Sequence, residues 1–110
     1  MTSEIKEHLY KKVYDLLGEA HMLIMANEEL SELTKSITKY QRNKIKASLQ
    51  IEERNPSLLE SIADEIADVE IMTEQIKQAF QLYKQVDNYK GEKLNRLDER
   101  VKVYEKQLRR

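Results

Sequence analysis

The fold of this chain is decided by one stretch, Leu23-Ile-Met-Ala-Asn-Glu-Glu-Leu-Ser-Glu-Leu-Thr-Lys-Ser-Ile37. Its apolar residues recur every three or four positions, which is the period of one face of an α-helix. The stretch contains neither glycine nor proline, so nothing interrupts that period. The pattern predicts a helix over about 20–42, with an apolar stripe formed by Leu23, Ala26, Leu30, Leu33 and Ile37.

Two glycines mark the expected ends of other helices. Gly18 follows an apolar pattern that predicts a first helix over about 4–17. Gly91 precedes the last predicted helix, over about 92–108, whose apolar residues repeat in a heptad pattern. We therefore expect the chain to break its helical path at each glycine.

The remaining helix is expected after the only proline of the chain. Asn55-Pro56 should end the polar stretch before it, because the residue that precedes a proline is disfavoured in the helical conformation. Ser57 and Glu60 then match the S-x-x-E pattern of a capping box. This pattern predicts a third helix over about 58–89.

Length and composition agree with an all-α fold, and we expect residues 1–110 to form a single domain, an antiparallel bundle of about four helices. The chain has 19 basic and 20 acidic side chains and a net charge of -1, which is unlike a nucleic-acid-binding protein. It has no cysteine, which excludes disulfides and thiolate metal sites. The polar N-terminus and the lack of a long apolar run predict a cytoplasmic protein that does not cross a membrane.

The apolar residues exceed what one small bundle buries. The last helix carries a heptad stripe, and Met22, Met25 and six tyrosines add further apolar surface. A homo-oligomer is therefore expected, and a two-fold dimer is the commonest such assembly.

Two pairs of acids carry the functional signal. Glu29 and Glu32 lie three residues apart in one predicted helix, and Glu65 and Asp68 lie three apart in another. Residues at this spacing share a helix face. If the two helices pack together, four carboxylates converge and repel one another unless protons or a cation neutralise them. Hard oxygen ligands at this density favour Mg²⁺, with Mn²⁺ as a possible substitute.

The acid pairs also have two interpretations other than a magnesium site. Acidic pairs three apart also arise by chance on a solvated helix face in a chain this rich in acids. A ferritin-like di-iron site would need Glu-x-x-His on two helices, whereas Glu32 and Asp68 occupy the positions where histidines would stand. An all-oxygen site is typical of magnesium and phosphate chemistry rather than of redox iron.

The two pairs, in this order, resemble the E-x-x-E and E-x-x-D signature of the MazG-like, all-α nucleoside triphosphate pyrophosphohydrolases. The resemblance extends from about Ala20 to Leu108. The strings that carry it are Met-Ala-Asn-Glu-Glu-Leu-Ser-Glu-Leu (25–33), Ser-Ile-Thr-Lys-Tyr-Gln-Arg (36–42), Ile-Ala-Asp-Glu-Ile-Ala-Asp-Val-Glu (62–70) and Lys-Leu-Asn-Arg-Leu-Asp-Glu-Arg (93–100). The interval between the pairs is longer than is usual in that family, and a polar insertion over about 44–56 would absorb the difference.

The resemblance implies hydrolysis of a nucleoside triphosphate, with a deoxynucleotide favoured, to the monophosphate and pyrophosphate. It also implies that Glu29, Glu32, Glu65 and Asp68 hold Mg²⁺ and that the protein acts as a homodimer or homotetramer. Small single-domain members of the family, of the phage and prophage type, are the most similar.

A mechanism for this activity follows from charge. A triphosphate and the acid cluster are both strongly negative, so Mg²⁺ would have to bridge them. Glu29 or Glu32 is expected to orient the attacking water or accept its proton, and water then attacks the α-phosphorus.

The leaving pyrophosphate calls for cations. The candidate residues for binding its phosphates are Lys39, Arg42, Lys93 and Arg96. The alternative to an enzyme is an oligomeric helical scaffold or a regulatory adaptor, in which the acids are only surface charge.

Overall fold

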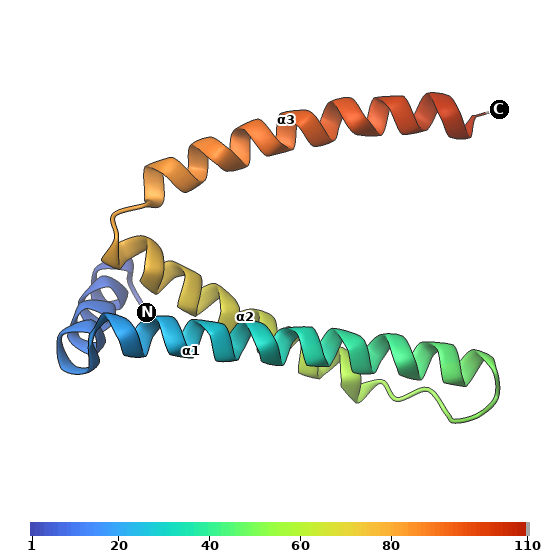
Figure 1. Cartoon of the computed structure of the whole chain (residues 1–110), viewed down its shortest axis with the longest axis horizontal. Coiled ribbons are helices and arrows are strands. Elements are labelled where there is room, and N and C mark those ends of the chain that lie inside the picture. The colour runs from blue at the N-terminus through green and yellow to red at the C-terminus, as the bar shows by residue number, and fades with distance from the viewer. Residues whose placement is uncertain (110) are drawn as a thin grey trace.

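A computed structural model describes residues 1–109 of the chain; Arg110, which the predicted domain includes, lies outside them. The described residues form three helices, α1 (Ser3–Ser48), α2 (Ser57–Ala79) and α3 (Tyr83–Leu108), and no strand (Figure 1). The predicted all-α class is confirmed. None of these helices has an apolar stretch long enough to cross a membrane.

Helix α1 consists of two helical parts that meet at Gly18. The backbone there has φ 85° and ψ 173°, a conformation open to glycine and disfavoured for residues that carry a Cβ. The first part begins beside Thr2, whose hydroxyl accepts a hydrogen bond from the Ile5 amide at 3.2 Å. The second part continues to Ser48, six residues past the expected end at 42.

A buried asparagine organises the connection between α1 and α2. The Asn43 side chain donates to the Glu53 carbonyl at 2.8 Å and accepts from the Asn55 amide at 2.9 Å. Asn55 in turn accepts a hydrogen bond from the Ser57 amide through its side chain at 3.1 Å. The predicted capping box at Ser57 is therefore wrong, because Asn55 serves as the cap and Pro56 already has helical dihedral angles.

The predicted third helix, over 58–89, is also wrong in its extent. Helix α2 ends at Ala79, and Gln81 takes the left-handed conformation with φ 54°. The Leu82 amide then donates to the Lys77 carbonyl at 2.8 Å, the bond that closes a Schellman motif. Gly91, the predicted break, lies inside α3.

Helices α1 and α2 form an antiparallel pair, and α3 leaves it. Within the described residues α3 contacts α2 and not α1, and Figure 1 shows α3 running away from the pair toward the C-terminus. The first part of α1 folds across the end of the pair where α2 finishes (Figure 1). The buried apolar residues are few, namely Tyr10, Met22 and Ala26.

Only part of the apolar stripe predicted for residues 20–42 is covered, because Ala26 is buried and Leu33 half-buried. Leu23, Leu30 and Ile37 are 37–47% exposed, whereas Met22 is buried one position earlier. Helix α1 therefore turns the flank that carries Glu29 toward α2 and leaves its richest apolar row uncovered.

Helix α2 has a matching uncovered row, formed by Leu59, Ile66 and Phe80, which are 38–53% exposed. Each residue in either row comes one or more heptads after the last. Both rows lie one residue after positions on the contact face, and each residue rotates the side-chain direction by about 100°. Because α1 and α2 are antiparallel, this rotation brings both rows to the same side of the pair. The two rows therefore form one apolar face, which we call the open face.

Candidate metal centre

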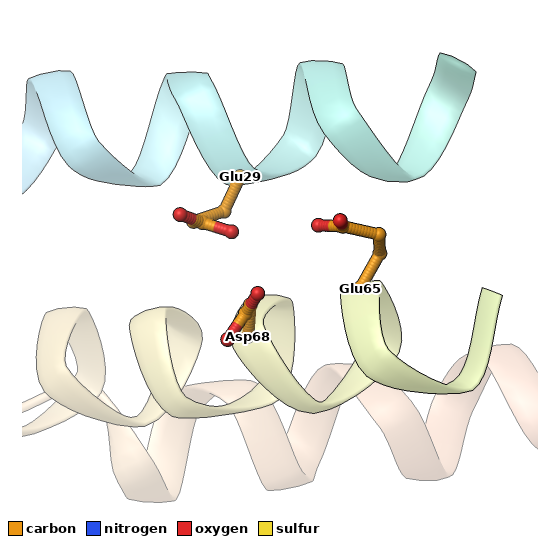
Figure 2. A group of neighbouring side chains, drawn as sticks. All are labelled: Glu29, Glu65 and Asp68. Atoms are coloured by element: carbon orange, nitrogen blue, oxygen red, sulfur yellow. The ribbon is translucent and has the colours of Figure 1, made fainter. Parts of the chain in front are cut away.

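Three of the four predicted acids meet between α1 and α2. Glu29 comes from α1, and Glu65 and Asp68 come from successive turns of α2 (Figure 2). One carboxylate oxygen from each lies within 4.8 Å of the other two. All three side chains are half-buried. The charged groups that meet here are therefore partly shielded from solvent.

The convergence is a consequence of helical register. Glu29 lies seven residues, or about two turns, after the buried Met22, so both residues face α2. Glu65 and Asp68 lie three residues apart and share the face of α2 that meets α1. Figure 2 shows the three carboxylates directed into the space between the two helices.

The electrostatics of the group is unfavourable without a positive charge. Desolvation raises the pKa of Glu29 above its ordinary value, and the charge of Asp68, a hydrogen bond to Asp68 and the charges of Glu65 and Glu32 raise it further. Desolvation likewise raises the pKa of Glu65, with added contributions from the charges of Asp68, Asp64 and Glu32.

Neutralising partners are missing as well. Glu65 Oε2 is buried and has no hydrogen-bond partner within the described part of the chain. None of the ion pairs among residues 1–109 includes Glu29, Glu65 or Asp68. Carboxylate oxygens that converge with no positive partner fit a hard divalent cation such as Mg²⁺, which would supply the missing charge.

Glu32, the fourth predicted ligand, lies apart from this group. Its side chain is exposed and pairs with Lys35, with Nζ 3.5 Å from Oε1. It is close enough for its charge to raise the pKa of Glu29 and of Glu65. Glu32 therefore lies beside the three-carboxylate group but is not part of it.

The four basic residues expected at the phosphates do not surround the acids. Lys39 and Arg42 line a hollow beside the connection to α2, about 15 and 20 Å beyond Glu29 along the axis of α1. Lys93 and Arg96 lie on α3, which extends away from the acid-bearing pair.

Lys35 is a basic residue close to the acids, and it was not among the four basic candidates predicted from the sequence. It lines an open hollow on the outer side of α1 together with Glu29 and Glu32. Its position three residues after Glu32 is the signal that could have found it, because residues at that spacing meet on a helix surface.

Searches of protein-family models, of curated proteins and of solved structures found no match to this chain. The resemblance to the MazG-like enzymes therefore stays a prediction that rests on the acid pairs and the strings around them. The three-carboxylate group is independent of that resemblance, because it follows from the packing of α1 against α2.

Proposed function

We propose that the protein is a Mg²⁺-dependent nucleoside triphosphate pyrophosphohydrolase that releases a nucleoside monophosphate and pyrophosphate, with deoxynucleotides favoured as substrates. One observation carries the proposal: Glu29, Glu65 and Asp68 converge within 4.8 Å with no counter-charge. Such a group destabilises the fold unless it has a cation to bind. The resemblance of the acid pairs to the MazG-like signature favours triphosphate chemistry for that cation.

The residues around the cation can be given roles. Glu29, Glu65 and Asp68 would hold Mg²⁺, which supplies charge neutralisation and a more acidic water when bound. Glu32, exposed beside them, would orient that water toward the α-phosphorus and accept its proton. Lys35 would offset the charge that develops on the departing pyrophosphate.

We further propose that the protein works as a homodimer or homotetramer in which the open face is covered by a second copy. The rows on α1 and α2 have the heptad spacing of helix-packing seams, and α3 carries a third row that includes Leu94, Val101 and Leu108, each 41–85% exposed. A second copy could also bring Lys93 and Arg96 toward the acids, which they do not approach within one chain.

Sedimentation velocity tests the assembly. The wild-type protein should sediment as a dimer or tetramer at micromolar concentration, and Leu30→Glu should shift it toward the monomer, because the charge would be buried in the seam. Ser31→Glu, at an exposed position that lies about 100° around α1 from Leu30 and outside the row, is the matched control. A wild-type protein that stays monomeric at high micromolar concentration would show that the open face has another use.

Product analysis tests the enzymatic proposal. A panel of nucleoside and deoxynucleoside triphosphates is incubated with the protein, with and without Mg²⁺, and the products are separated by ion-exchange chromatography. Monophosphate and pyrophosphate should appear only with the metal. Release of single phosphate would contradict attack at the α-phosphorus. No turnover, combined with no effect of Mg²⁺ on the melting temperature, would favour the helical scaffold, which the uncovered apolar rows also fit.

A further inference from the structure

A second polar site lies beside the metal centre, between the first part of α1 and the end of α2. It is a cavity of about 340 Å³. Two tyrosines, two glutamines and a methionine form the part of its wall that matters here: Tyr10, Tyr14, Met22, Gln75 and Gln78.

The bend at Gly18 creates this cavity. It folds the first part of α1 back onto α2 (Figure 1), where the Tyr10 hydroxyl donates to Glu74 Oε2 at 2.7 Å and Gln78 Nε2 donates to the Glu7 carbonyl at 2.8 Å. A continuous helix through Gly18 would carry Tyr10 and Tyr14 away from α2 and leave no cavity. The cavity is thus held by two hydrogen bonds between segments that are distant in the chain.

The lining selects the kind of ligand. The two ionisable groups of opposite charge at the cavity, Lys11 and Asp15, neutralise each other at 2.7 Å. The remaining wall consists of aromatic rings, a thioether and carboxamides. A site without net charge but with flat apolar surfaces and hydrogen-bonding amides suits a planar, neutral, polar group better than a phosphate or a metal ion.

One wall residue has an unused acceptor. Gln78 Oε1 is buried and lacks a hydrogen-bond partner in the described chain. The orientation of this amide is fixed, because its nitrogen already donates to the Glu7 carbonyl and a flipped amide would oppose two acceptors. The acceptor therefore lacks a donor, and a buried acceptor left without one is unfavourable.

The cavity and the metal centre are spaced along the same helix pair. Met22 precedes Glu29 by seven residues on α1, and Gln75 follows Asp68 by seven on the antiparallel α2. At 1.5 Å per residue, both helices separate the two sites by about 10 Å. A sugar with its glycosidic bond and 5′-phosphate ester bridges a gap of this order between a base and an α-phosphorus.

We propose that this cavity binds the nucleobase of the substrate, with Gln75 and Gln78 hydrogen-bonding to the edge of the base and Tyr10 and Tyr14 packing against its surface. The proposal rests on the function proposed above and adds the residues that would determine base preference.

The test separates base binding from phosphate chemistry. Nucleosides lack phosphate and need no metal, so each of the four deoxynucleosides is added to ¹⁵N-labelled protein without Mg²⁺. The side-chain NH₂ resonances of Gln75 and Gln78 should shift with at least one of them, whereas that of Gln41, exposed far along α1, should not.

A pair of variants then links the cavity to turnover. Gln78→Met keeps the side-chain volume but removes the amide, and it should lower kcat/KM for the preferred triphosphate about tenfold while flattening the preference among bases. Gln41→Met should leave both unchanged. The rise in melting temperature on adding Mg²⁺ should be the same in both variants and in the wild type, which shows that the fold and the metal centre are intact.

The outcomes distinguish the two proposals. Turnover with no nucleoside-induced shift, and with an unchanged base preference in Gln78→Met, overturns the base site while the enzymatic function stands. Nucleoside-induced shifts without any triphosphate turnover overturn the enzymatic function while the cavity remains a nucleobase site. If neither is observed, both proposals are wrong.

Discussion

Carboxylates at two places along the contact between α1 and α2 have opposite surroundings. At one end, Glu74 accepts a hydrogen bond from Tyr10 at 2.7 Å and pairs with Lys6 at 3.3 Å. The hydrogen bond from Tyr10 is the main reason that the pKa of Glu74 lies below its ordinary value, and Lys6 lowers it further. Nearer the middle of the contact, Glu29 and Glu65 face Asp68, form no ion pair, and have raised pKa values.

The difference in partners indicates which acids stabilise the fold. Glu74 joins the first part of α1 to α2, and in the same contact burial and Glu74 raise the pKa of Tyr10 to about 12. Glu29, Glu65 and Asp68 instead oppose the packing of the same two helices, because their charges repel one another. Groups that destabilise a fold yet occupy its interior contact are expected to serve binding or catalysis.

The largest effect is expected from Glu29→Gln. The substitution removes one metal ligand, so turnover should fall by at least about 100-fold. It also removes like-charge repulsion, so the free energy of unfolding without metal should stay the same or rise. Pyrophosphate release and urea denaturation without Mg²⁺ measure the two quantities. Unfolding of the metal-free variant would mean that Glu29 is a structural partner and that the site is misassigned.

Glu74→Gln is the matched control, because the same chemical change is made in a carboxylate with donors. Loss of the charge-assisted bonds should lower the free energy of unfolding by about 1–2 kcal/mol. Turnover should stay within about twofold of the wild type, since Glu74 lies two turns beyond Asp68 on α2. If Glu29→Gln and Glu74→Gln changed turnover and the free energy of unfolding in the same way, the different surroundings of the two carboxylates would have no functional meaning.

The smallest effect is expected from pH. The raised pKa values of Glu29 and Glu65 mean that the folded metal-free protein binds more protons than the unfolded chain between the ordinary value of 4.5 and the raised values. The free energy of unfolding should therefore rise as pH falls through that window. Glu74 acts with the opposite sign and below 4.5, because its pKa is lowered.

Denaturation without metal across this pH range, on the wild type and on Glu29→Gln, isolates the contribution of the site. The rise in stability should be smaller in the variant, which has one fewer group to protonate. If the free energy of unfolding had the same pH dependence in both proteins, the pKa of Glu29 would not be raised by its surroundings. Mg²⁺ should suppress the rise in the wild type, because the cation and the proton compete for the same oxygens.

Local rules predicted the acid cluster but misplaced the helix ends. Helical spacing alone fixed the faces of Glu29, Glu65 and Asp68, so their convergence required only that α1 and α2 pack together. One helix was predicted to end at about 42 and another to break near Gly91, yet Gln50 and Gln81 adopt φ values of 61° and 54° and close Schellman motifs. A left-handed glutamine carries little sequence signal, because the position normally favours glycine or asparagine.

The positions of the basic residues depend on tertiary structure and could not be read from spacing. Lys93 and Arg96 were candidates because they are basic and belong to the C-terminal string that resembles the MazG-like enzymes. The turn at Gln81 directs α3 away from the pair, and no local pattern states that direction. Lys35 was within reach of the same spacing rule that found the acids.

Because α3 touches the rest of the described chain only near its own start, it can fold and unfold as a separate cooperative unit. A single helix of this length is marginally stable in water without tertiary contacts. In an isolated copy, the amide hydrogens of α3 should therefore exchange with solvent far sooner than those at the contact of α1 with α2. Association of a second copy would couple α3 to that contact, so the order of the C-terminal quarter would increase with protein concentration.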